Sequence, residues 1–161
     1  NRLEAIISIA KTEEKVRPTV FVIDIDRFKQ VNDTIGYSDG DRLVHAFAER
    51  LKEVMPREAE IGRISAGEFA VLIPDAELGA ARRFAEGLRT DFPGGSAGLL
   101  PGPLSPTVSI GLCMAGPGTE LYDLLHRADE ALYHAKRLGR NQVQVFTPRE
   151  SAAVAAQPAS A

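Results

Sequence analysis

The fold of this chain is decided by one stretch, Arg63-Ile64-Ser65-Ala66-Gly67-Glu68-Phe69-Ala70-Val71-Leu72-Ile73. A short turn of small residues separates two strand-like runs, which is the pattern of a β-hairpin. We therefore predict that residues 61–64 and 68–73 form its two arms. Small side chains at the tip of a hairpin let a ligand approach the backbone closely. The tip is thus the predicted centre of the functional site.

The composition is that of one soluble globular domain. The 161 residues are enough for a sizeable core, and the formal net charge of -3 offers no basic field to nucleic acid, so no nucleic-acid partner is expected. Cys113 is the single cysteine, which excludes an intrachain disulfide and suits a reducing compartment. No apolar run is long enough to cross a membrane. We expect a cytoplasmic segment without membrane contact, cut from a longer protein that could itself be membrane-anchored.

Helices and a strand are predicted on the N-terminal side of the hairpin. Thr19–Ile25 is β-branched and aromatic, which indicates a central strand buried on both faces. Gly36 is expected to cap the short helix after this strand, and Asp39-Gly40-Asp41 is expected to form a turn in which Asp41 caps the next helix. The helical stripes occupy residues 2–12, 28–35 and 43–54.

The C-terminal half continues with alternating helix and strand patterns. A helix is predicted over Glu77–Arg89, with Leu78, Ala81, Ala85 and Leu88 facing inward. The remaining predicted segments are a Gly/Pro-rich loop, a strand, a helix, a short strand and a disordered tail, over residues 93–106, 107–114, 121–137, 142–146 and 148–161. Helices and strands that mix without strict alternation predict the α+β class, with one domain over residues 1–147.

Polar residues at the end of the central strand are the first candidates for chemistry. Asp24 continues the buried register of this strand, and a buried carboxylate requires a cation or hydrogen-bond donors. Mg2+ together with phosphates is one solution. The alternative, which spacing alone slightly favours, is that Asp24 and Asp26 form a helix-capping pair at the junction of strand and helix.

Two further pairs suit a nucleotide. Asn32 and Asp41 combine an amide and a carboxylate, which together can read the edge of a purine, although spacing alone favours ordinary turn and cap chemistry. Lys136 and Arg140 bracket Gly139 at the end of a helix, where positive charges can hold a triphosphate. The commoner role for such cations is to complement a helix C-terminus.

Several of these motifs together resemble one family, the GGDEF domains or diguanylate cyclases. The residues from Asp24 to Gly36, followed by Gly40-Asp41, look like the first signature of that family. Thr107-Val108-Ser109-Ile110-Gly111 resembles its later strand, and residues 128–136 followed by Gly139-Arg140-Asn141 resemble its closing helix. The resemblance covers residues 1 to about 147 and implies a nucleotidyl-cyclase-like, mostly antiparallel sheet flanked by helices.

The resemblance also implies roles for individual residues. Asp24 and the backbone carbonyl of Ile25 would face a divalent metal, Mg2+. Asn32 and Asp41 would read guanine, and the phosphates of GTP would be held by Lys136, Arg140 and the segment at Phe28 and Lys29. Members of the family pair two GTP-loaded domains head to head, and each ribose 3'-hydroxyl attacks the α-phosphate of the other nucleotide to give cyclic di-GMP.

The hairpin tip departs from the family pattern. Family members carry Gly-Gly-Asp/Glu-Glu-Phe, whereas this chain carries Ser65-Ala66-Gly67-Glu68-Phe69. Gly67 therefore stands where the acidic metal ligand should be, and Glu68, its neighbour along a strand, is expected to point the other way and to substitute poorly as a catalytic ligand. The Arg-x-x-Asp motif of product inhibition would fall on Pro56 and Ala59, so it is absent.

These observations favour a degenerate GGDEF domain that binds GTP, with a weakened Mg2+ site, but does not turn it over efficiently. We expect such a domain to regulate an attached or partner module, a cyclic di-GMP phosphodiesterase (EAL) domain. One alternative is an active diguanylate cyclase in which Glu68 or water completes the metal site. The other is a homodimerisation or interaction module that binds no nucleotide.

Overall fold

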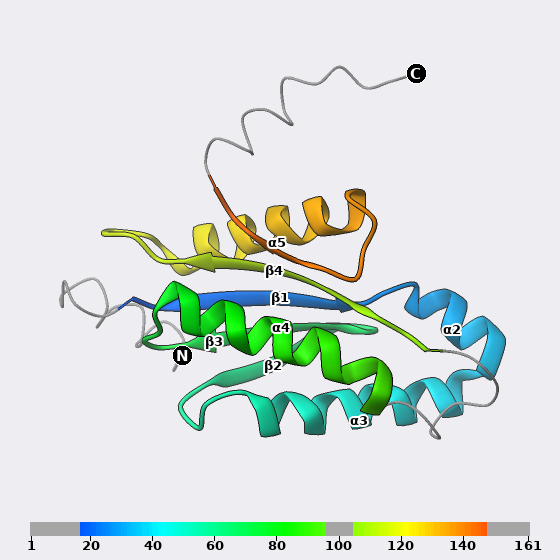
Figure 1. Cartoon of the computed structure of the whole chain (residues 1–161). Coiled ribbons are helices and arrows are strands. Elements are labelled where there is room, and N and C mark those ends of the chain that lie inside the picture. Colours follow the sequence, from blue (N-terminus) through cyan, green and yellow to red (C-terminus); the bar gives the residue numbers. More distant parts are fainter. Residues whose placement is uncertain (1–16, 96–104, 148–161) are drawn as a thin grey trace, which may run out of the picture.

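The computed structural model describes residues 17–95 and 105–147 (Figure 1). Its elements are β1 (Thr19–Ile25), α2 (Phe28–Ile35), α3 (Tyr37–Val54), β2 (Glu60–Ser65), β3 (Glu68–Ile73), α4 (Leu78–Gly95), β4 (Val108–Met114), α5 (Leu121–Arg137) and β5 (Val143–Val145). The predicted helix over residues 2–12, the predicted tail and residues 96–104 of the predicted loop lie outside the described residues. None of the described helices is long and apolar enough to cross a lipid bilayer.

A five-stranded sheet in the order β2-β3-β1-β4-β5 forms the centre of the domain. β1 is the middle strand and pairs antiparallel with both β3 and β4. β2 and β3 form the predicted hairpin, and among the described strands β5 alone joins the sheet in parallel, beside β4. The predicted class, α+β with a mostly antiparallel sheet flanked by helices, is confirmed.

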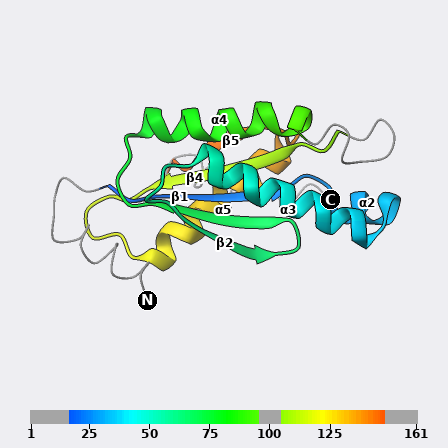
Figure 2. The ribbon, with the colours of Figure 1, turned by 90° about the horizontal axis from the view of Figure 1, so that it is seen from below.

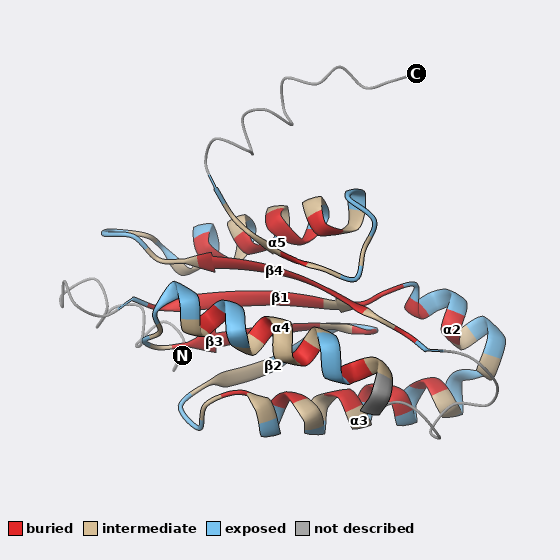
Figure 3. Ribbon diagram, in the orientation of Figure 1, coloured by how far each residue is buried: buried red, intermediate tan, exposed pale blue. Residues whose placement is uncertain are grey.

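The central strand is buried on both faces because two separate helical layers cover the sheet. Phe21 and Ile23 of β1 belong to the larger core beneath α3 and α4, and Val20 and Val22 belong to a smaller core beneath α5. Figure 1 shows α5 on one side of the sheet and α3 and α4 on the other, and Figure 2 shows α3 and α4 crossing the same face. In Figure 3, β1 and β4 are accordingly coloured as buried along almost their whole length.

α5 lies unusually close to the sheet at Gly111 of β4. A β-carbon at this position would overlap the backbone of α5 at Ala128 and Leu132. The inward face of the helix is made mainly of small residues there, since Ala128, Ala131 and Ala135 are all buried. The absence of a side chain at Gly111 therefore sets the distance between helix and sheet, and with it the position of the C-terminal end of α5.

The predicted turn at Asp39-Gly40-Asp41 is wrong. α3 begins at Tyr37, so these three residues already lie within the helix and Asp41 does not cap it. Gly36 alone, at φ 86° and ψ 162°, ends α2 and precedes α3. A glycine at positive φ can redirect the chain in a single residue, which makes a longer turn unnecessary.

The helix predicted over Glu77–Arg89 also differs in extent. α4 continues to Gly95 and contains Pro93, which the sequence analysis placed in a loop. The continuation is explained by Phe92, which is buried four residues after Leu88 and lies with its ring centroid 4.8 Å from that of Phe47. Ala81, Ala85 and Leu88 are buried as predicted, but Leu78 is 40% exposed because it is the first residue of the helix.

Candidate functional site

The carboxylates of Asp24 and Glu68 lie on the same face of the sheet. Asp24 is the direct cross-strand partner of Glu68 on β3 and of Ser109 on β4. Directly opposed residues of an antiparallel pair project to the same side. Val22 shares this side by alternation and packs beneath α5, so both carboxylates project toward the α5 layer.

Two cations, one in the last turn of α5 and one in the turn after it, approach Asp24. The Nζ atom of Lys136 forms an ion pair with Oδ2 of Asp24, whose side chain is only 18% exposed. Arg140 lies close enough to act on the same carboxylate electrostatically. Burial nevertheless raises the pKa of Asp24 above its ordinary value, although the hydrogen bond and charge of Lys136 oppose this rise. The structure thus brings together three of the residues for which the family resemblance implied metal and phosphate roles.

Glu68 does not point away from this cluster, as alternation from Gly67 had led us to expect. The register of β1 with β3 places it opposite Asp24, and Oγ of Ser65 donates a 3.3 Å hydrogen bond to its Oε2. Partial burial, followed by the negative charge of Asp24, raises the pKa of Glu68. Two facing carboxylates with raised pKa values form a place where added positive charge is favourable.

The raised pKa of Glu68 predicts a pH-dependent stability. A folded-state pKa above the unfolded value means that the folded domain loses stability as pH rises from the ordinary glutamate value of 4.5 through the raised value. Glu68→Gln removes this loss, so we expect the variant to have a higher free energy of unfolding than the parent domain at pH 7, but not at pH 3. Urea unfolding at both pH values measures this difference.

The exposed Glu58 provides the matched control, since Glu58→Gln should change the free energy of unfolding by no more than about 0.5 kcal/mol. A Glu68→Gln variant that was less stable than the parent at pH 7 would contradict an unfavourable pairing of Glu68 with Asp24.

Gly67 closes the hairpin without offering a side chain to the site. It has φ 76°, and its carbonyl accepts a 2.9 Å hydrogen bond from the backbone N–H of Ile25. A β-carbon built on Gly67 would lie 2.8 Å from Cγ of Phe28. Phe28 is itself buried at the start of α2. The position therefore lacks the acidic side chain of the family and also lacks room for one.

The predicted base-reading residues lie on the packed helices α2 and α3. The side chain of Asn32 rests against Gly40, where a β-carbon would overlap its amide oxygen. That oxygen is buried and has no hydrogen-bond partner among the described residues. Asp41 lies one residue further along α3, is exposed, and lines a cavity of about 520 Å³ whose walls include Val44 and Phe69. Asn32 thus packs at the contact between the two helices, whereas the neighbouring Asp41 faces the cavity.

Asp26 has a different role from the helix-capping one that spacing favoured. The residue that precedes α2 is Arg27, and the structure shows no side-chain capping bond there. Instead the buried carboxylate of Asp26 accepts hydrogen bonds from three donors, which are Oγ1 of Thr107 at 2.7 Å, Oγ of Ser109 at 2.6 Å and the backbone N–H of Asn141 at 3.0 Å. Asp26 therefore joins β4 and the turn after α5 to the end of β1. No local sequence pattern predicts this network, because its members are far apart in the chain.

Comparison with known proteins agrees with this architecture. The family model of the diguanylate cyclase GGDEF domain matches residues 1–142. The response regulator PleD of Caulobacter vibrioides is 40% identical over 128 residues, which are 78% of this chain and 28% of PleD. The diguanylate cyclase VdcA of Vibrio cholerae is 36% identical over 134 residues, which are 78% of this chain and 38% of VdcA. The chain thus spans well under half of these two relatives.

Solved structures give the same result. The active GGEEF domain of a diguanylate cyclase from Vibrio cholerae has a TM-score of 0.84 at 26% identity, over 91% of this chain and 92% of that one. The GGDEF domain of DgcB from Caulobacter crescentus, in complex with c-di-GMP, has a TM-score of 0.81 at 28% identity, over 90% of this chain and 86% of that one. This chain belongs to the GGDEF domain family, the diguanylate cyclases of cyclic di-GMP signalling.

Proposed function

We propose that this GGDEF domain binds GTP without cyclising it efficiently, and that it acts as a regulatory domain in a cyclic di-GMP signalling protein. The observation that carries this proposal is Gly67, which places no carboxylate at the hairpin tip and whose β-carbon direction is filled by the ring of Phe28. Phosphoryl-transfer catalysis depends on positioning and on charge stabilisation by metal ions. The loss of the acidic ligand at the hairpin tip should therefore impair the turnover of GTP more than the binding of GTP.

The proposed binding residues extend from the base to the phosphates. Asn32 and Asp41 would hold the guanine, since an exposed carboxylate can accept from its N–H groups. Lys136 and Arg140 would hold the phosphates, together with the backbone at Phe28 and the exposed side chain of Lys29. The negative charge of a triphosphate gives Lys136 an alternative partner to Asp24.

The residues fit a magnesium ion that arrives with the nucleotide. The described residues contain no group of three or more His, Cys, Asp or Glu side chains arranged for a metal. They do provide Asp24 and Glu68 on one face, with raised pKa values, and we propose the Ile25 carbonyl beside them. Mg2+ is commonly held by one or two carboxylates plus substrate phosphates. When bound, the ion would neutralise charge on the triphosphate.

Calorimetric titration of GTP with Mg2+, followed by product analysis of the same mixture, tests the proposal. We expect binding without cyclic di-GMP. Asp41→Ala should weaken GTP binding about ten- to hundredfold, because a hydrogen bond to a charged group is lost. The matched control is Asp39→Ala on the same helix, since Asp39 is paired with Arg42 at 3.3 Å and should not affect GTP.

The other outcomes identify the alternatives. Binding accompanied by cyclic di-GMP would mean that Glu68, which faces Asp24, completes an active metal site. No binding by the parent domain would leave the domain as a homodimerisation or interaction module. We further propose that the complete protein works in the cytoplasm, where GTP is available, and that its partner is an EAL-type phosphodiesterase domain. A solved structure with a TM-score of 0.67 and 29% identity comes from a protein described as an EAL/GGDEF domain protein, which supports that pairing.

A further inference from the structure

Unusual backbone conformations are concentrated around Asp26. Among the described residues, the non-glycine residues with positive φ are Arg27 at 53°, Arg140 at 65° and Asn141 at 47°. Arg27 follows Asp26 directly, and the N–H of Asn141 donates to the Asp26 carboxylate. Left-handed conformations are unfavourable for most residues and persist where the surrounding contacts enforce them. The contacts that hold residues 140 and 141 are therefore of functional interest.

The turn that carries Arg140 is fixed mainly through its backbone. The N–H of Arg140 donates to the carbonyl of Ala135 at 2.9 Å, which closes the end of α5. Nε2 of Gln142 donates to the carbonyl of Arg140 at 3.2 Å, and the N–H of Asn141 donates to Asp26 at 3.0 Å. These bonds leave the side chain of Asn141 available for one more partner.

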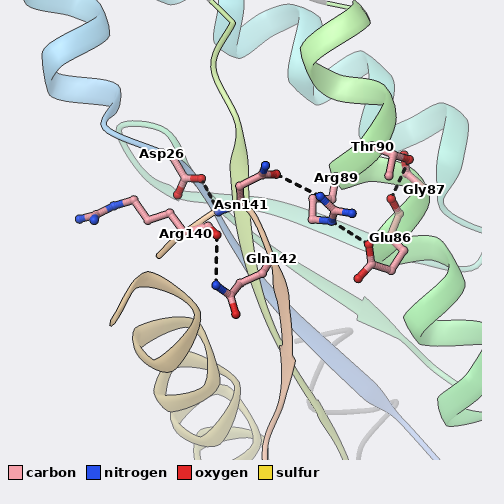
Figure 4. Close-up of polar contacts among 8 residues, drawn as sticks. All are labelled: Asp26, Glu86, Gly87, Arg89, Thr90, Arg140, Asn141 and Gln142. Carbon is pink, nitrogen blue, oxygen red and sulfur yellow. Dashed lines mark hydrogen bonds and ion pairs between the residues drawn. The ribbon is translucent and has the colours of Figure 1, made fainter. Parts of the chain in front are cut away.

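That partner is Arg89, which comes from α4 on the opposite side of the sheet from α5. Its Nη1 donates to Oδ1 of Asn141 at 3.2 Å, and its Nε donates to Oε2 of Glu86 at 2.7 Å (Figure 4). The side chain of Arg89 is 26% exposed. A guanidinium group is planar and rigid, so the bond to Glu86 fixes the direction in which Nη1 points. Glu86 thus orients Arg89, and Arg89 in turn holds the side chain of Asn141.

We infer that Arg89 is a positioning residue for Arg140, through Asn141. The inference rests on the proposed function, in which Arg140 holds phosphate. In Figure 4 the side chains of Arg140 and Asn141 leave the turn in opposite directions, so Arg89 restrains one side of the turn while Arg140 is presented on the other. Arg140 is near enough to Asp24 to act on it electrostatically, which places its charge beside the proposed metal and phosphate site.

The docking of α4 does not depend on the bond between Arg89 and Asn141. Four apolar residues of α4 are buried against the sheet and α3, namely Ala81, Ala85, Leu88 and Phe92. A separate ion pair between Arg50 of α3 and Asp91 of α4, at 2.7 Å, also joins these helices. Arg89→Ala is therefore expected to leave the domain folded and to act on the turn.

Titrations of GTP with Mg2+ and of guanosine, followed by NMR, test this inference. Arg140 would contact only the phosphates, so Arg89→Ala should leave the affinity for guanosine unchanged. It should weaken GTP binding about tenfold, as is common for outer-shell partners of binding residues. Asn141→Gly, which tolerates positive φ but removes the acceptor, should weaken GTP similarly, and the double variant should lose no more than either single one. Arg50→Ala removes the ion pair that joins α3 to Asp91 of α4, and it should change the binding of neither GTP nor guanosine.

Equal GTP affinity in Arg89→Ala and the parent domain would overturn the inference, and so would an equal loss of GTP and guanosine, which indicates general destabilisation. If the parent domain bound no GTP, the proposed function would fail by itself. Amide hydrogen exchange of Arg140 and Asn141 in the ligand-free domain decides the positioning role in that case. Faster exchange in Arg89→Ala, but not in Arg50→Ala, would support the role, and unchanged exchange would overturn it.

Discussion

Gly111→Ala should lower the free energy of unfolding by about 3 kcal/mol or more. The added methyl group would meet the backbone of α5 at Ala128 and Leu132 rather than a side chain that can rotate away. The helix must therefore move off the sheet, and the small buried residues beneath it lose contact. Urea unfolding, followed by circular dichroism, measures the loss.

The matched control is Gly62→Ala on β2, where a β-carbon would meet no described residue within 4 Å beyond its chain neighbours. We expect that variant to remain within about 0.5 kcal/mol of the parent domain. Similar unfolding midpoints for Gly111→Ala and Gly62→Ala would show that α5 can shift at no cost. In the predicted case, movement of α5 would also displace Lys136, so GTP affinity should fall together with stability.

Gly67→Asp should destabilise the domain by about 2–5 kcal/mol instead of restoring a metal ligand. An aspartate at φ 76° costs about 1–2 kcal/mol, and its β-carbon, 2.8 Å from Cγ of Phe28, adds about 1–3 kcal/mol. Urea unfolding gives the loss of stability, and product analysis should still find no cyclic di-GMP, because the ring of Phe28 must move before the carboxylate can approach Asp24.

Gly118→Asp separates the two contributions, because Gly118 has φ 73° and no described residue beyond its chain neighbours lies within 4 Å of its β-carbon position. It should show only the conformational cost, about 1–2 kcal/mol. In a Phe28→Leu background, Gly67→Asp should lower the free energy of unfolding by less than it does in the parent domain. Equal losses in Gly67→Asp and Gly118→Asp would contradict the contact with Phe28.

Local patterns predicted most of the secondary structure. Thr19–Ile25 and Leu121–Arg137 were predicted with the bounds that the structure gives, because a continuous β-branched run and a long helical stripe are strong signals. The connections were less predictable. The sequence does not indicate that Gly36 alone can separate two helices, or that burial of Phe92 carries α4 through Pro93.

The candidate site was predictable as a set of residues but not as an arrangement. The resemblance to GGDEF domains named Asp24, Lys136 and Arg140, and the structure brings these three together. The position of Glu68 opposite Asp24 depends on strand register, which a single sequence does not reveal. The bond between Arg89 and Asn141 spans 52 positions, and its geometry depends on where α4 packs, so no local pattern could have indicated it.

The central position of β1 has a consequence for how the domain folds. This strand is made before its two neighbours, β3 and β4, and β4 ends only at Met114. During synthesis the hairpin β2–β3 can form from residues that are close in the chain. Strand β1, in contrast, keeps at least one unpaired edge until β4 has left the ribosome. The segment Val20-Phe21-Val22-Ile23 is uncharged and strongly β-forming, so it can self-associate during this interval. Truncations that end before β4 should therefore aggregate rather than form a smaller stable domain.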